Sequence, residues 1–221
     1  MPIRVKICCI ASIDEARLAV AQGAAAIGLV SEMPSGPGVI DLDTIQRVAR
    51  ATPPPVATVL LTSRTDPAGL IDHVKQSGAN TVQIVDAVPA AAYAALRQAV
   101  PQVKIVQVVH VTGDRSVDEA VGLRGQVDAL LLDSGNPTAA VKELGGTGRV
   151  HDWRLSRRIV TESDLPVFLA GGLNADNVGD AIRAVGPYGI DLCSSVRTDD
   201  RLDAAKLTRF MAAVGAADRA A

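Results

Sequence analysis

Aromatic side chains are almost absent from this sequence: Phe, Trp and Tyr make up 2% of its 221 residues. A core must therefore be assembled from Val, Ile, Leu and Ala, which suit parallel strands covered by helices. Cysteine is also scarce, and the three in the chain are Cys8, Cys9 and Cys193. An odd count with two neighbours excludes a secreted disulfide framework and indicates a reducing compartment.

Long hydrophobic runs and blocks of like charge are missing too. No apolar stretch approaches the ~20 residues needed to cross a bilayer, and the first residues, MPIRVKICC, do not resemble a signal peptide. The formal net charge is −2, so nothing indicates a basic surface for nucleic acid or for an anionic membrane. We therefore expect a soluble, cytoplasmic protein with no nucleic-acid or membrane partner.

What the sequence does contain is a regular alternation of short β-branched runs and amphipathic stretches. Eight strands, each followed by a helix, predict a (β/α)8 TIM barrel, with residues 1–221 forming a single domain. A doubly wound open sheet would use the same pieces, but it usually carries GxGxxG after its first strand, where this chain reads CCIASI. The expected strands are 3–8, 26–30, 56–61, 81–85, 103–109, 128–133, 167–170 and 189–192, and the expected helices are about 13–22, 41–51, 67–77, 89–99, 116–123, 153–163, 175–185 and 203–214.

Several helix ends carry their own signals. Ser12 and Glu15 form a capping box at the start of the first helix. Asp152 and Asn174 are expected to be N-caps of later helices. The small, polar tail after Val214 is expected to be frayed and disordered.

Catalytic groups in such barrels come from the C-terminal ends of the strands, and Cys8 ends the first of them. Strand alternation directs Lys6 and Cys8 into the barrel, and Ile7 and Cys9 to the other face. A cation beside a thiol favours the thiolate, which accepts protons. The alternative is that Cys8 is a small buried hydrophobic residue, which is the interpretation we favour for Cys9.

Asp133 closes the sixth strand after three leucines. A carboxyl group there either faces a site or is buried at a cost in free energy. If it is partly desolvated, it can hold its proton near neutral pH and donate it to a substrate. A structural carboxylate that caps a helix or ties a loop is the alternative.

Two polar turns follow the last two strands. Gly171 and Gly172 precede a helix start, and Ser194 and Ser195 follow the eighth strand. Glycines let the backbone approach an anion, and a phosphate site after strands 7 and 8 recurs in this fold. Two tight turns without a ligand would be the alternative, but their order along the chain favours the phosphate site.

The remaining glycine cluster and the histidines give weaker signals. The cluster GGTG at 145–148 lacks the Lys and Ser/Thr of a nucleotide-binding P-loop, and we expect it to form a loop over the barrel mouth. His73, His110 and His151 show no metal-ligand spacing, so the histidines give no sign of a metal site. Of these, His110 is a candidate to face the site, and His73 is expected on a solvated helix face.

Taken together, the segments VKICCI, LLLDS, GGTGRVHDW and LAGGLNADN resemble the phosphoribosylanthranilate isomerase family of tryptophan biosynthesis, over nearly the whole chain. The resemblance implies a monomeric or dimeric (β/α)8 barrel that performs an Amadori rearrangement of a phosphosugar without metal or cofactor. It implies that Cys8 is the general base, that Asp133 is the general acid and that Asp191 is an acidic residue at the mouth. It places the phosphate on the turns that carry Gly171, Gly172, Ser194 and Ser195.

The chain departs from the family pattern at the end of the site that would hold the aglycone. Cys9 stands where the family has glycine, and Gly38 stands where it has an arginine that holds the anthranilate carboxylate. Losing a bidentate clamp of this kind weakens carboxylate binding. The departures leave three readings open: an isomerase in which Arg64, Arg115 or His110 replaces the arginine, an isomerase or epimerase for another phosphorylated sugar, and an inactive phosphosugar-binding paralogue.

Overall fold

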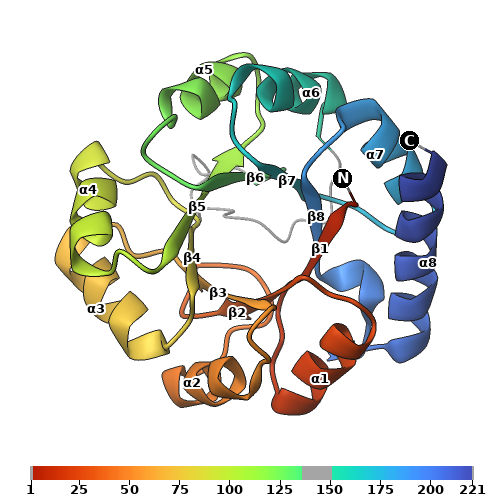
Figure 1. The fold of residues 1–221 in the computed structure, drawn as a ribbon, viewed down its shortest axis with the longest axis horizontal. Helices are drawn as coiled ribbons and strands as arrows, with labels where there is room; N and C mark the ends of the chain where they lie inside the picture. Colours follow the sequence, from red (N-terminus) through yellow and green to blue (C-terminus); the bar gives the residue numbers. More distant parts are fainter. Residues whose placement is uncertain (1, 136–150, 221) are drawn as a thin grey trace.

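The computed structural model describes residues 2–135 and 151–220, and within them eight parallel strands close into a barrel surrounded by helices (Figure 1). Strand β1 pairs with β2 on one side and with β8 on the other, which closes the ring. The predicted (β/α)8 TIM barrel is confirmed. The strands are β1 (Arg4–Ile7), β2 (Ala26–Val30), β3 (Ala57–Thr62), β4 (Thr81–Ile84), β5 (Lys104–His110), β6 (Ala129–Asp133), β7 (Val167–Leu169) and β8 (Gly189–Leu192).

Helices follow the strands in the expected order and form the outer ring. A short 3-10 helix η1 (Ser194–Val196) and a hairpin of β9 (Arg197–Thr198) and β10 (Arg201–Leu202) precede the last helix. The α-helices are α1 (Ile13–Ala21), α2 (Leu42–Ala51), α3 (Pro67–Ser77), α4 (Ala90–Ala99), α5 (Arg115–Gly122), α6 (Trp153–Glu162), α7 (Val178–Val185) and α8 (Ala204–Ala220). None of these described helices is both long and apolar enough to cross a membrane.

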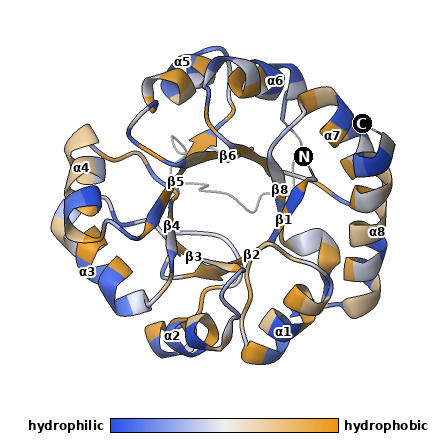
Figure 2. Cartoon of the chain, in the orientation of Figure 1, coloured by the Kyte–Doolittle hydropathy of each residue, from blue (hydrophilic) through white to orange (hydrophobic). Residues whose placement is uncertain are grey.

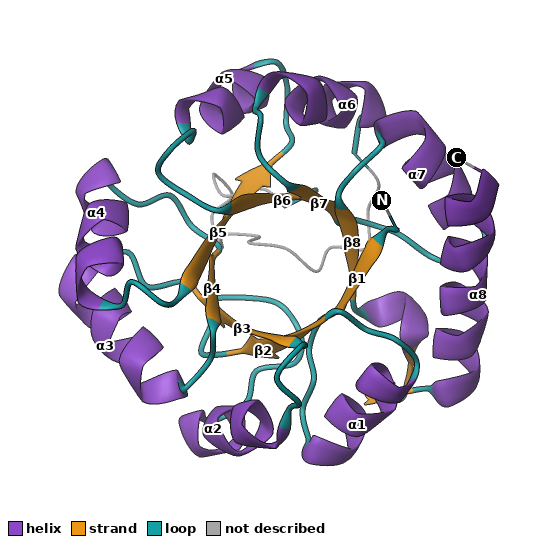
Figure 3. Cartoon of the chain, viewed as in Figure 1, coloured by secondary structure: helices purple, strands orange, loops and turns teal. Residues whose placement is uncertain are grey.

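Two apolar clusters hold the barrel together, one on each face of the strands. Outward-pointing residues such as Ile27 and Leu60 pack against the helices, while inward-pointing residues such as Ala26 and Val59 fill the interior. Strands β3 and β6 are accordingly hydrophobic, whereas the helices carry mixed polar and apolar residues (Figure 2). The layering, with strands inside and helices outside, is seen in Figure 3. Small interior side chains leave room for polar groups inside the barrel.

The helix caps follow the sequence signals in part. The Ser12 hydroxyl accepts the Glu15 N–H at 3.2 Å, and the Asp152 carboxylate accepts the Arg154 N–H at 2.9 Å. The expectation for Asn174 was wrong: its side chain caps a turn that ends at Asn177, and helix α7 begins only after that turn.

The C-terminal tail differs from the sequence expectation. Helix α8 extends to Ala220, through the segment expected to fray. Ala217 is buried in the core, and the Asp218 carboxylate accepts the Ile3 N–H at 3.1 Å. These contacts give the tail tertiary partners that its small, polar composition does not reveal.

One ion pair lies inside the barrel. The Lys6 ammonium donates to the Asp191 carboxylate at 2.9 Å, and both side chains are over nine-tenths buried. The residues are register partners on β1 and β8, so the pair spans the seam where the barrel closes. Burial alone would lower the pKa of Lys6, but Asp191 and Cys8 raise it above its ordinary value. Lys6 is therefore charged, and its charge is balanced locally.

Replacing Lys6 by methionine is expected to lower the free energy of unfolding by about 3–5 kcal/mol, because the substitution leaves a buried carboxylate without a partner. Urea denaturation measures the change. Lys104→Met is the matched control, since Lys104 is exposed and pairs with Asp128 at 3.3 Å at the surface. That control is expected to change stability by about 0–1 kcal/mol. Equal effects of the two substitutions would contradict the argument.

Candidate active site

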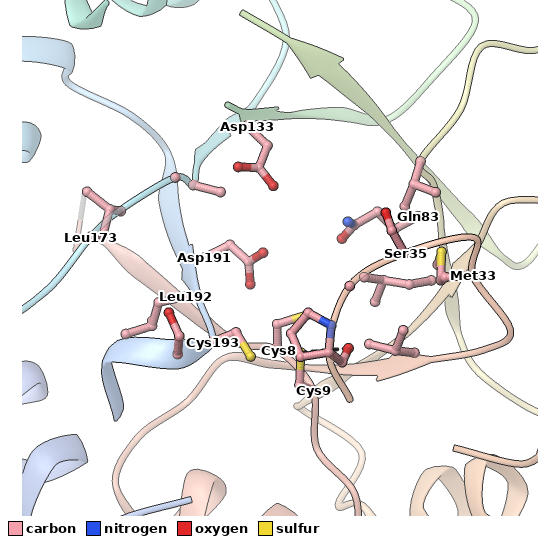
Figure 4. A pocket seen from close by; sticks show the side chains of 18 of the residues that line it. Cys8, Cys9, Met33, Ser35, Gln83, Asp133, Leu173, Asp191, Leu192 and Cys193 are labelled. Carbon is pink, nitrogen blue, oxygen red and sulfur yellow. Dashed lines mark hydrogen bonds between the residues drawn. The ribbon is translucent and has the colours of Figure 1, made fainter. Parts of the chain in front are cut away.

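The C-terminal ends of the strands surround a cavity at one end of the barrel (Figure 4). Residues from β4, β6 and β8, and from the segments after β1, β2 and β7, line it. The side chains of Cys8, Asp133, Asp191 and Gln83 converge on it from different strands. The barrel thus brings together groups that lie more than a hundred residues apart in the chain.

Cys8 follows β1 and points into this cavity, as strand alternation predicted for Lys6 and Cys8. The residue is 6% exposed, and its backbone N–H donates to the Leu192 carbonyl at 2.8 Å. A Cβ atom on Gly28 of the neighbouring strand would lie 2.8 Å from the Cys8 Sγ. Glycine at position 28 therefore provides the space that the sulfur occupies.

Cys9 also lines the cavity, so the expectation that it faces away with Ile7 was wrong. Its φ angle is 62°, in the left-handed region, and this turns the side chain back toward the mouth. The Cys9 thiol donates to the Pro37 carbonyl at 3.6 Å. Hydrogen bonds with the Cys193 and Cys8 thiols, together with burial, raise the pKa of Cys9. Cys9 is therefore a neutral thiol that packs beside Cys8.

Gly38 and Cys9 are in close contact. A Cβ atom on Gly38 would lie 2.4 Å from the Cys9 Cβ and 2.9 Å from its Sγ. Gly38 itself has a φ angle of 79°, which L-residues with side chains rarely adopt. Positions 9 and 38, where the sequence departs from the family pattern, are therefore in direct contact, and a side chain at position 38 would overlap that of Cys9.

Arg197, which the sequence did not single out, holds the backbone at this point. Its Nη2 donates to the carbonyl oxygens of Cys8 and Cys9, and its guanidinium pairs with Glu15 at 3.1 Å. Burial alone would raise the pKa of Glu15, but Arg197 and the N–H groups of Ala11 and Leu202 hold it below its usual range. This buried pair connects helix α1 to the segment after β8 and fixes the two carbonyls that flank Cys9.

Asp133 lies at the end of β6, 8% exposed, and its carboxyl group points into the cavity. Its Oδ1 accepts the Ser134 N–H at 2.7 Å. The register partner of Asp133 on β5 is His110, which is buried and hydrogen-bonds through Nε2 to the Val85 carbonyl at 3.1 Å. The described lining of the cavity includes Asp133 but not His110.

Asp191, on β8, lines the same cavity. Burial raises its pKa, Lys6 opposes that shift, and Asp133 adds to it. The cavity therefore carries two carboxyl groups, one of which is balanced by a buried lysine.

The phosphate turns predicted from the sequence lie at one side of the cavity. Gly171 and Gly172 have φ angles of 83° and 64°, and both line the cavity together with Ser194. Backbone in such turns forms a concave row of N–H groups that binds anions. Ser195 lies in η1, and its buried Oγ has no partner within the described residues; it is not among the lining residues.

The other candidates lie elsewhere. His73, expected on a solvated face, is buried, and its Nδ1 lies 3.1 Å from the Thr62 hydroxyl, so that expectation was wrong. Arg64 donates to the Gly69 carbonyl and lies on a different pocket. The exposed Arg115 begins α5, outside the described lining. The GGTG segment at 145–148 falls outside the described residues. Within the described residues, no group of three or more His, Cys, Asp or Glu is arranged to hold a metal ion.

A glycine turn after β7, a thiol and a carboxyl group meet at the mouth of this closed barrel, and the loops after strands 7 and 8 frequently bind phosphate in (β/α)8 enzymes. Comparison with known proteins gives the family. The sequence model described as N-(5'-phosphoribosyl)anthranilate (PRA) isomerase matches residues 5–213. The chain belongs to this family.

Individual relatives support the same assignment. N-(5'-phosphoribosyl)anthranilate isomerase 2 of Methanosarcina mazei is 36% identical over 211 residues, which cover 95% of this chain and 92% of the relative. The crystal structure of phosphoribosyl anthranilate isomerase from Thermotoga maritima superposes with a TM-score of 0.82 at 27% identity, covering 97% of this chain and 99% of that one. A family structure in complex with reduced 1-(o-carboxyphenylamino)-1-deoxyribulose 5-phosphate has a TM-score of 0.79 at 25% identity, with the same coverage.

Proposed function

We propose that this protein is an aldose–ketose isomerase that converts N-(5'-phosphoribosyl)anthranilate to the corresponding 1-amino-1-deoxyketose in tryptophan biosynthesis. The observation that carries the proposal is that Cys8 and Asp133 line one cavity together with Gly171 and Gly172. Family membership over almost the whole chain supports it.

In the proposed mechanism, the glycine turns and Ser194 hold the phosphate, with Ser195 beside them. Asp133 gives its proton to the ring oxygen as the C1–O bond breaks, which leaves a protonated imine at C1. The Cys8 thiolate then removes the proton from C2, and the C–H electron pair forms a C1–C2 double bond while the imine nitrogen takes up its electrons. The resulting enol becomes the ketone by proton transfer. Each residue thus performs one proton transfer.

The ion pair between Asp191 and Lys6 determines the role that we assign to Asp191 in this mechanism. Asp191 stays paired with Lys6 at 2.9 Å and lies next to the two proton-transfer groups. The ion pair therefore places a polar group at the cavity whose negative charge is balanced by Lys6. We propose that Asp191 accepts a hydrogen bond from a substrate hydroxyl, because Lys6 contacts only its Oδ1 and a carboxylate has a second accepting oxygen.

The test is turnover of N-(5'-phosphoribosyl)anthranilate by the purified protein, followed by the loss of substrate fluorescence. The second candidate is an isomerase or epimerase for another phosphorylated sugar, and Gly38 favours it because the family carries an arginine there. Turnover of a simple aldose or ketose 5-phosphate without turnover of the anthranilate compound would support the second candidate. Binding of phosphosugars without any turnover would indicate an inactive paralogue.

The expected setting is a cytoplasmic enzyme that acts on a small phosphosugar as a monomer or homodimer, without a nucleic-acid partner. Size-exclusion chromatography with light scattering measures the oligomeric state.

A further inference from the structure

Gln83 is a buried amide with an unsatisfied acceptor. It lies on β4 and is 3% exposed, yet its Oε1 has no hydrogen-bond partner within the described residues. Buried side-chain amides are nearly always paired, because an unpaired polar atom loses its hydration without compensation. A native protein that keeps such an atom indicates a partner supplied from outside the chain.

The position of Gln83 points to the candidate active site as the source of that partner. Gln83 lines the mouth cavity that contains Cys8 and Asp133, and its amide points toward the Asp133 and Asp191 carboxyl groups (Figure 4). Two lining neighbours, Leu61 on β3 and Val85 directly after β4, have apolar side chains that offer no hydrogen bond.

The barrel order specifies which end of a ligand would reach Gln83. In the closed ring β1 to β8, β4 lies across from β8, whereas the phosphate turns follow β7 and β8. A phosphosugar anchored at Gly171 and Gly172 therefore extends past Cys8 and Asp133 toward Gln83. The group that meets Gln83 belongs to the end of the ligand remote from the phosphate.

We propose that Gln83 is a substrate-binding residue whose Oε1 accepts a hydrogen bond from an N–H or O–H at the reacting end of the aminosugar. This inference rests on the proposed function and assigns one more contact to the same site. With the Asp133 and Asp191 carboxyl groups, Gln83 presents acceptors to a ligand rich in N–H and O–H donors. A charged acceptor in its place would add a third acidic group to a cavity whose described lining contains no lysine or arginine.

A paired amide on the next strand provides a matched control. Gln107 of β5 is equally buried, but its Oε1 accepts the Tyr93 hydroxyl at 2.8 Å and its Nε2 donates to the Asp86 and Val108 carbonyls. Gln107 is absent from the described cavity lining. The same substitution at the two positions therefore separates a ligand-binding amide from a structural one.

The experiment compares Gln83→Met and Gln107→Met with the unmodified chain. Isothermal titration measures Kd for two probes, reduced 1-(o-carboxyphenylamino)-1-deoxyribulose 5-phosphate and inorganic phosphate, and thermal unfolding without ligand measures Tm. Gln83→Met is expected to raise Kd for the reduced product about three- to tenfold, the effect of one net hydrogen bond, and to leave Kd for phosphate unchanged. Its Tm is expected to stay level or rise, because the substitution removes an unpaired acceptor. Gln107→Met is expected to lower Tm and to leave both Kd values unchanged.

An unchanged Kd for the reduced product in Gln83→Met overturns the inference, whatever happens to Tm. A Gln83→Met protein that fails to fold also overturns it, because the unpaired amide is then part of the scaffold. If the unmodified chain turns over N-(5'-phosphoribosyl)anthranilate while Gln83→Met binds normally, the inference fails and the proposed function stands. If the unmodified chain neither turns over the substrate nor binds the reduced product, the proposed function is overturned, and the inference about Gln83 is overturned with it.

Discussion

Replacing Cys8 by alanine is expected to lower kcat for N-(5'-phosphoribosyl)anthranilate by about 10²–10⁴-fold, the usual contribution of a positioned general base. The Cys8 thiol lines the cavity on the wall opposite Asp133, and the adjacent Cys9 is a poor substitute base because burial and hydrogen bonds raise its pKa. KM is expected to change little, because the phosphate turns and the rest of the cavity remain. Steady-state fluorescence kinetics give both parameters.

Cys193→Ala is the matched control for the loss of a thiol. Cys193 lines the same cavity and is more exposed than Cys8. A hydrogen bond from Cys9 lowers the pKa of Cys193, which favours its thiolate. The Cys193→Ala variant therefore removes an ionisable sulfur from the cavity and leaves Cys8, the proposed base, in place. This variant should keep kcat within a few-fold. If Cys193→Ala lost as much activity as Cys8→Ala, the base would have been assigned to the wrong sulfur.

Replacing Asp133 by asparagine is expected to lower kcat by a similar factor of about 10²–10⁴. Asparagine keeps the size and the hydrogen bond from the Ser134 N–H, but it cannot deliver a proton to the ring oxygen. The loss should be smaller for a substrate analogue whose ring is already open, because ring opening is the step that needs the acid. Comparing the two substrates by single-turnover kinetics isolates that step.

Asp86→Asn serves as its control. Asp86 follows β4, two strands away from β6, at the same end of the barrel, but it is not part of the described cavity lining. Its substitution changes the local charge by the same amount and should leave kcat nearly unchanged. An equal loss in both variants would mean that the charge of the rim, and not proton donation by Asp133, determines the rate.

Much of the barrel could be predicted from the sequence because its periodicities are strong. Inward and outward residues alternate along the strands, so the inward direction of Lys6 and Cys8 follows from counting residues. Cys9 broke that rule because a single left-handed φ angle ends the alternation. The family resemblance contained a sign of this conformation, because the family has glycine at position 9 and glycine adopts left-handed φ angles without strain.

The remaining parts of the site depend on contacts that no local pattern contains. Glu15 and Arg197 pair across 182 positions of the chain, and neither residue is unusual in its own segment. Gln83 did carry a signal, because it is a polar residue at an inward position of a buried strand, between Val82 and Ile84. His73 misled the prediction since its helix looks amphipathic, whereas its ring is held inside by Thr62.

The contact between Cys9 and Gly38 has a consequence for how this branch of the family can evolve. A side chain at position 38 would begin inside the volume of the Cys9 side chain, so the two positions cannot enlarge independently. A lineage that gains a bulky residue at position 38 must first lose the side chain at position 9, whereas the reverse order passes through a clashing intermediate. Substitutions at these two positions are therefore epistatic, and among descendants of this chain they should be inherited as a pair.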